Sequence, residues 1–170
     1  MSLARTSNGS NTPSNRAPAI KISAVSDTHV IAARALIGLK DLKGAEARLK
    51  KALSLDAQSA PALANLGHIH ALRRNSREAL RNLDAALKAN PTDFETRDFR
   101  GDFLLLQKKT DEALAEYLKA IEYGTFPGWI AHATRIKAAR LHEAKGELKE
   151  AVNLMTRAIR GDPRNHASLQ

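Results

Sequence analysis

The sequence predicts an all-α protein, a solenoid of four helix–turn–helix repeats that follows a flexible N-terminal tail. The composition is the first indication: 43% of the 170 residues are hydrophobic, mainly Ala and Leu, and only 4% are aromatic, which favours helices over strands. The second is self-similarity, because Ala45, Ala79 and Ala113 stand at matching places in segments that return every 34 residues. The third is the helical spacing of apolar residues inside each segment.

The first 26 residues predict the disordered tail. They are rich in Ser, Asn, Thr and Pro, contain no Asp or Glu, and lack the apolar surface that offsets the entropy of ordering. Organelle transit peptides and bacterial secretion leaders also lack acidic residues, but this segment has only three basic residues and neither a continuous apolar region nor a clear amphipathic helix. We therefore favour a plain extension over residues 1–26.

The second helix of each repeat carries two alanines seven residues apart. Both lie on one helical face, where a small side chain lets a neighbouring helix approach closely. A larger residue between them fills the adjoining space. The alanine pairs are Ala45 and Ala52, Ala79 and Ala86, Ala113 and Ala120, and Ala151 and Ala158, and the larger residues are Leu49, Leu83, Tyr117 and Met155.

The first helix of each repeat is an amphipathic segment with one small residue at a matching place. These residues are Ala33, Gly67, Gly101 and Ala139. Pro61 suits a first helical turn and Pro91 an interhelical loop. The predicted helices span residues 27–39, 43–56, 60–73, 76–88, 94–107, 111–123, 128–145 and 147–160.

This pattern resembles the tetratricopeptide repeat family, whose unit is a 34-residue helix–turn–helix with one small residue in helix A and two in helix B. The second copy matches best, at Leu63, Leu66, Gly67, Ala79, Leu83, Ala86 and Pro91. The third copy has Arg97 and Arg100 at positions that are usually apolar. The resemblance implies a right-handed α–α superhelix over residues 27–165, with repeats at about 26–59, 60–93, 94–127 and 132–165 and a C-terminal tail at 166–170.

The resemblance also implies a binding surface, because helix A lines the concave side in this family. The positions that usually contact ligands carry Arg34, Asn65, His68, Glu95, Asp98, Asp102, Lys137 and Arg140. Glu95, Asp98 and Asp102 form one stripe of carboxylates, which we expect to attract a basic peptide. Alternatively, Glu95 belongs to a capping box that begins at Thr92, and Asp98 pairs with residues near Arg97 or with adjacent repeats. The family's clamp for chaperone C-termini is not expected, because Glu95 stands where the clamp needs a positive charge.

No motif indicates catalysis or a metal site. The sequence lacks a nucleophile–base pairing, a Gly-rich phosphate loop after a strand, and zinc or calcium motifs. It has no Cys, and His68 and His70 point roughly 200° apart around their helix, so they cannot share a metal. We expect a protein that is not an enzyme and needs no cofactor.

A net charge of +9 supports an alternative function, RNA or anionic-surface binding. Arg73, Arg74, Arg77 and Arg81 form one basic cluster, and the last repeat holds another. Such clusters can bind phosphates, but few aromatic residues are present to stack on bases. We therefore favour a simpler explanation, in which these charges solvate the convex surface.

Two other features could contact a partner. The linker between the third and fourth repeats contains Phe126 and the only Trp, Trp129, which either anchor a partner or pack back onto the repeats. The last helix carries an apolar stripe without an obvious capping helix after it, so its edge could dock a partner or mediate self-association. The stripe consists of Leu148, Val152, Met155 and Ile159. Alternatively, Ala167 to Gln170 and the polar residues around them are sufficient to finish the array.

These observations predict a protein-interaction scaffold or adaptor that binds a peptide or partner protein in a concave groove. No run of about 18 apolar residues is present to span a bilayer, and residues 1–26 lack a secretory h-region. We expect a cytoplasmic location.

Overall fold

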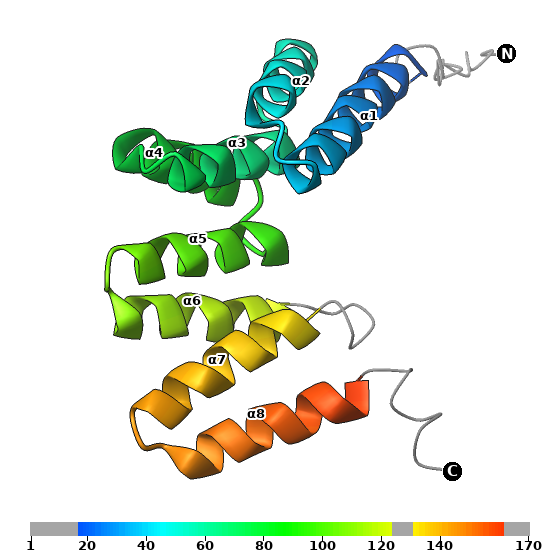
Figure 1. The fold of residues 1–170 in the computed structure, drawn as a ribbon. Helices are drawn as coiled ribbons and strands as arrows, with labels where there is room; N and C mark the ends of the chain where they lie inside the picture. Colours follow the sequence, from blue (N-terminus) through cyan, green and yellow to red (C-terminus); the bar gives the residue numbers. More distant parts are fainter. Residues whose placement is uncertain (1–16, 124–130, 162–170) are drawn as a thin grey trace, which may run out of the picture.

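The computed structural model describes residues 17–123 and 131–161, which form eight helices and no strand (Figure 1). The all-α solenoid prediction is confirmed, and seven of the eight helices lie within a few residues of their predicted ranges. The helices are α1 (Ala17–Gly38), α2 (Leu42–Leu55), α3 (Ala60–Leu72), α4 (Ser76–Ala89), α5 (Phe94–Leu106), α6 (Thr110–Tyr123), α7 (His132–Ala144) and α8 (Leu148–Gly161). None of the helices in the described ranges has the length and apolar character needed to cross a membrane.

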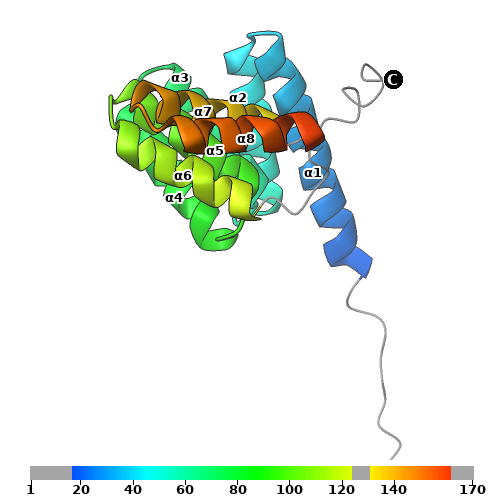
Figure 2. The ribbon, with the colours of Figure 1, turned by 90° about the horizontal axis from the view of Figure 1, so that it is seen from below.

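Successive helices pair into four hairpins that stack along one direction, with α1 and α8 at opposite ends (Figure 1). The hairpins are joined through contacts of α2 with α3, α4 with α5, and α6 with α7. Helix α3 also touches both α1 and α5. Figure 2 shows the stack from below, with α1 extending away from it. The first helices of the repeats therefore share one side of the solenoid.

The first helix is longer than predicted, so the predicted tail over residues 1–26 is wrong for residues 17–26. Pro18 occupies the first helical turn, where its missing N–H is not needed. Ser26 is buried, and its hydroxyl donates to the carbonyl of Ala52 in α2 at 3.3 Å. The average composition of residues 1–26 did not reveal that the helix begins at Ala17, because the Ser, Asn and Thr residues of this segment are concentrated before Ala17. Residues 1–16 and 166–170 lie outside the described ranges.

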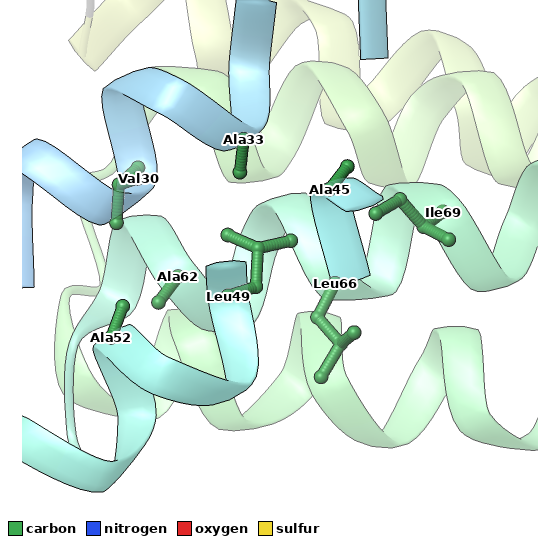
Figure 3. Packing of buried hydrophobic residues seen from close by; sticks show 8 residues of the cluster. All are labelled: Val30, Ala33, Ala45, Leu49, Ala52, Ala62, Leu66 and Ile69. Atoms are coloured by element: carbon green, nitrogen blue, oxygen red, sulfur yellow. The ribbon is translucent and has the colours of Figure 1, made fainter. Parts of the chain in front are cut away.

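The core is built from the predicted small and large positions. Figure 3 shows the first cluster, in which Leu49 of α2 packs among residues of α1, α2 and α3. Ala45 and Ala52 are fully buried. A Cβ added to Gly67 would lie 2.8 Å from Cγ of Leu83, too close for two carbon atoms. The small residues therefore set the distance between the two helices of a repeat, as predicted. One large residue departs from the pattern: Met155 of α8 is partly exposed, because no described helix follows to cover it.

A repeated backbone conformation closes each hairpin. Lys40, Arg74, Lys108 and Gly146 stand at the same place in the four repeats, and each has a positive φ, between 60° and 79°. This left-handed conformation satisfies carbonyls at the end of the first helix. Three of the four residues are not glycine, so the alignment of small residues did not reveal the turn.

Candidate functional site

The candidate site is the side of the solenoid formed by α1, α3, α5 and α7, which we call the helix A face. All eight ligand positions predicted from the sequence belong to these four helices. The structure joins five of them, Arg34, Glu95, Asp98, Asp102 and Lys137, into two groups of ion pairs between different repeats. Of the remaining three, Asn65 is buried, His68 stacks on an aromatic ring, and Arg140 is exposed.

One ion pair links the first repeat to the third. The guanidinium of Arg34 on α1 donates to the carboxylate of Glu95 at the start of α5. Burial raises the pKa of Glu95 above its ordinary value, and the nearby Arg34 only partly opposes this shift. The structure does not support the alternative in which Thr92 is the N-cap of α5 and Glu95 completes a capping box. Asp93 is the N-cap residue, because its carboxylate accepts from the backbone N–H of Thr96 at 2.8 Å.

The second group centres on Lys137 of α7. Its ammonium lies 2.8 Å from the carboxylate of Asp98 and 2.8 Å from that of Asp102, both on α5. Thr134 also donates to Asp98 at 2.7 Å. Burial lowers the pKa of Lys137, but the hydrogen bonds with Asp102 and Asp98 outweigh it, so the net shift is upward. The ammonium therefore stays charged and ties the fourth repeat to the third.

Tyr117 of α6 completes this group, although the sequence indicated only a core role for it. Its ring is fully buried, and its hydroxyl donates to Asp102 at 2.7 Å. Burial and the bond to Asp102 raise the pKa of Tyr117 well above its ordinary range, so the hydroxyl remains a donor. A signal was present in the sequence: Tyr replaces the Leu of the first two repeats, and a buried tyrosine hydroxyl usually needs a partner.

His68 and Asn65 of α3 do not project as free ligands. The imidazole of His68 stacks on Phe99 of α5, with ring centroids 4.3 Å apart. Burial lowers its pKa, which favours the neutral ring. Asn65 is only 2% exposed, and its side-chain amide donates to the carbonyl of Pro61 at 2.8 Å. In this structure Asn65 supports the start of α3 and is not available at the surface, contrary to the prediction.

The charges left accessible on this face belong to a few side chains. Arg34 is 44% exposed, Asp102 35% and Lys137 32%. Arg140 is exposed about one turn beyond Lys137 on α7. Asp98 and Asp102 bring two negative charges against the one positive charge of Lys137, so this group has a carboxylate in excess. A cationic group would gain most by approaching Asp102.

The helix A face presents hydrogen-bond donors and acceptors of both charges. Within residues 17–123 and 131–161, no group of three or more His, Asp or Glu residues could hold a metal ion. The tyrosine and lysine near Asp102 are both held in their protonated forms, which makes them donors and not nucleophiles. The other predicted contact residues, Phe126 and Trp129, lie outside the described residues.

The basic cluster on the second repeat is partly neutralised by acidic neighbours. Arg73 donates to the carboxylate of Glu46 and to the carbonyl of Leu42 at 3.2 Å. Arg81 lies 3.6 Å from Glu78. Arg74 and Arg77, the other two members, are exposed.

The two arginines at usually apolar positions of the third repeat also have acidic partners. Arg97 lies 3.0 Å from Glu116 of α6, and Arg100 lies 3.2 Å from Asp84 of α4. Ion pairs thus replace apolar contacts at these two positions.

A pocket of about 320 Å³ lies beside the turn between α3 and α4 and was not expected from the sequence. Ala71, Phe103 and Leu106 form its apolar wall, and Arg74, Ser76 and Gln107 line the remainder.

Comparisons with known proteins place this fold among characterised repeats. A family model described as a tetratricopeptide repeat-like domain matches residues 24–143. Solved structures that are similar include PilF of Pseudomonas aeruginosa (TM-score 0.74, 19% identity), MamA (0.65, 21%) and the type IV pilus biogenesis factor PilW (0.69, 21%). These alignments cover 84%, 88% and 82% of this chain, and 63%, 86% and 63% of the respective chains. Comparison with curated proteins gives no match.

Proposed function

The chain belongs to the tetratricopeptide repeat-like family, and from this premise we propose that it is a non-enzymatic scaffold or adaptor that binds a segment of another protein along the helix A face. The proposal rests mainly on one observation: partly exposed charged side chains from α1, α5 and α7 line that face in alternating sign. Helical repeats commonly present such extended surfaces to a partner.

The partner segment should carry at least one Lys or Arg. Asp102 is partly exposed and shares Lys137 with Asp98, so a cationic side chain can approach it without displacing Lys137. Charge-assisted hydrogen bonds of this kind contribute about 1.5–3 kcal/mol when they are well formed. Arg34 and Arg140 offer sites for a carboxylate on the same segment.

Affinity capture with the full chain tests the proposal. Immobilised wild-type protein is compared with Asp102→Asn, which removes the charge at nearly constant shape, and with Asp84→Asn as a matched control. Asp84 is exposed and pairs with Arg100, but it lies on α4, outside the helix A face. Lysate is treated with nuclease at near-physiological salt, and partners are identified by mass spectrometry.

We expect partners that bind the wild type and Asp84→Asn to bind Asp102→Asn at least about tenfold more weakly, which corresponds to about 1.4 kcal/mol. Titration of the purified partner segment by calorimetry then measures each dissociation constant. Equal binding by all three proteins would contradict the proposal. Capture that disappears after nuclease treatment would favour the alternative, in which Arg74, Arg77 and their neighbours bind nucleic acid.

A cytoplasmic location is part of the same proposal. It rests on the composition of the chain and is tested by fractionating cells that express it with a C-terminal epitope. Recovery of the epitope outside the cytoplasmic fraction would contradict it. PilW is described as a type IV pilus biogenesis factor, so an envelope location is the outcome to distinguish.

A further inference from the structure

Helix α8 exposes an apolar stripe along one side. Leu148, Val152, Met155 and Ile159 follow each other at helical spacing, and Val152 and Ile159 are 64% and 47% exposed. The adjoining side of α8 is buried through Ala151, Leu154 and Ala158. Exposed large hydrophobic residues in one row are typical of an interaction surface.

The repeat itself indicates what covers these positions. Val152, Met155 and Ile159 are equivalent to Leu114, Tyr117 and Ile121 of α6, since 38 residues separate each pair. In α6 these three residues are at most 9% exposed and share a core cluster with Ala138 of α7. The side of α8 that is exposed is therefore the side on which α6 receives the first helix of the next repeat.

The other end of the molecule exposes the matching half of that contact. Thr134, Ala138 and Leu141 lie on α7, and Leu141 packs against the cluster that contains Leu114 and Ile121. Their equivalents on α1 are Thr28, Ala32 and Ala35. Thr28 and Ala35 are exposed and Ala32 is partly exposed, whereas Thr134 and Ala138 are buried.

We propose that two copies of this chain associate head to tail, with α1 of one copy packed on α8 of the other as α7 packs on α6. Large side chains on α8 would face small ones on α1, as Leu114 and Ile121 cluster with Ala138 inside the molecule. At the third position, Ala35 is smaller than its equivalent Leu141. The contact joins two different surfaces, so each dimer still exposes one free α1 and one free α8. Further copies can add, and the product is an open chain that continues the solenoid.

Sedimentation velocity on the full chain, from about 1 µM to about 500 µM, covers the micromolar range of dissociation constants. One variant blocks α8 (Val152→Glu with Ile159→Glu), and a second blocks α1 (Thr28→Glu with Ala35→Glu). Leu106→Glu is the matched control, because Leu106 is 67% exposed on α5, away from both faces. Circular dichroism verifies that each variant keeps its helices.

We expect the wild type and Leu106→Glu to exceed twice the monomer mass of 18.5 kDa as concentration rises. Each blocked variant alone stays monomeric, and an equimolar mixture of the two forms dimers and nothing larger, since only one productive contact remains. A monomeric wild type overturns the proposal. So does an α1-blocked variant that still dimerises, because that result indicates a symmetric contact between two α8 helices.

Cross-linking provides a second test that does not depend on charged substitutions. The chain has no Cys, and α6 and α7 run in opposite directions (Figure 1), so the equivalent of Leu114 should meet the equivalent of Leu141. Mixed Ala35→Cys and Val152→Cys proteins should form a disulfide-linked heterodimer at least about tenfold faster than mixed Thr28→Cys and Val152→Cys proteins. Equal rates for the two mixtures would refute the head-to-tail register.

Discussion

At the scale of single residues, two glycines determine how closely the helices of a repeat approach. A Cβ on Gly101 would lie 2.7 Å from Cδ1 of Tyr117, and one on Gly67 would lie 2.8 Å from Cγ of Leu83. Leu83 and Tyr117 are fully buried, so they have little room to move aside. The Tyr117 hydroxyl also donates to Asp102. A change in packing at Gly101 would therefore also change the position of a hydrogen bond on the helix A face.

We expect Gly101→Ala and Gly67→Ala each to lower the free energy of unfolding by about 1–3 kcal/mol, the usual cost of overpacking. Gly38→Ala is the control, because nothing lies within 4 Å of the Cβ position at Gly38. It should be neutral or slightly stabilising. Urea unfolding of the three variants measures the difference, and identical midpoints for Gly101→Ala and Gly38→Ala would contradict the packing argument.

His68 makes stability depend on pH. Burial lowers its pKa below the ordinary value of 6.5, and this outweighs the attraction of Asp102. As pH falls through 6.5, the unfolded chain binds a proton that the folded chain does not, so stability falls until the lower folded-state pKa is passed. The contribution of His68 is complete above pH 6.5.

We therefore expect wild-type protein to lose more stability between pH 8 and pH 5 than His68→Gln does. Unfolding free energies of both proteins at the two pH values measure this difference, and an NMR titration of the imidazole locates the folded pKa directly. A folded pKa above 6.5 would reverse the expected sign.

At the scale of helices, the four hairpins share one turn geometry but not one turn residue. Arg74 adopts φ 60° where Gly146 adopts φ 79°. The left-handed region costs a residue with a Cβ about 1 kcal/mol or more, and glycine avoids this cost. The fourth repeat therefore has the least strained turn.

Exchanging residues between these turns should change stability in opposite directions. We expect Arg74→Gly to raise the free energy of unfolding by up to about 1 kcal/mol and Gly146→Ala to lower it by about 1 kcal/mol. No atom lies within 4 Å of the Cβ position at Gly146, so its effect isolates backbone strain. Thermal and urea unfolding provide the measurement, and a stabilised Gly146→Ala protein would exclude this explanation.

The ion pairs of Lys137 act between helices, because they connect α7 to α5. Removal of the ammonium in Lys137→Met leaves Asp98 and Asp102 facing each other without a cation. Since Lys137 is about one-third exposed, we expect a loss of about 1–3 kcal/mol, below the cost of breaking a fully buried pair.

A double-mutant cycle with Asp102→Asn separates this interaction from local packing. Asp102→Asn should cost less in the Lys137→Met background than in the wild type, because repulsion between the carboxylates is relieved. Additive effects, measured by urea unfolding, would mean that the pair contributes nothing to the link between the third and fourth repeats.

At the scale of the whole molecule, stability comes from contacts between neighbours in a line. Each inner helix is covered by helices on two sides, whereas α8 has an exposed apolar side and packs chiefly on α7. The stability of such arrays is approximately a sum of terms for repeats and for their interfaces. The ends should therefore open before the middle.

Hydrogen exchange of dilute protein tests this expectation. Amides of α8 should exchange at least about tenfold faster than those of α3 and α4, a difference of about 1.4 kcal/mol in the free energy of local opening. If the copies associate as proposed, protection of α8 should increase as the protein concentration rises. Uniform protection at all concentrations would indicate that the solenoid opens as a single unit.

The sequence alone determined the repeat architecture, because small residues recur at fixed intervals and the pattern resembles the tetratricopeptide repeat. Ala45, Ala52, Gly67 and Gly101 were assigned correctly as close-contact positions for this reason. The start of α1 at Ala17 was missed, since composition averaged over 26 residues conceals a local change. The left-handed turns were also missed, because Lys40, Arg74 and Lys108 carry no signal for them.

The roles of the polar residues depend on how the helices pack in three dimensions. The family resemblance placed Arg34, Glu95, Asp98, Asp102 and Lys137 on the same side, but their mutual pairing depends on how α1 and α7 pack against α5. Asn65 stands at a position that usually contacts ligands in the family, and packing buries it in this chain. Local periodicity identifies which face a residue belongs to, whereas the partner of a side chain depends on distances between segments far apart in the chain. The sequence alone therefore determines the scaffold, and the distances between helices decide which charges remain free to bind.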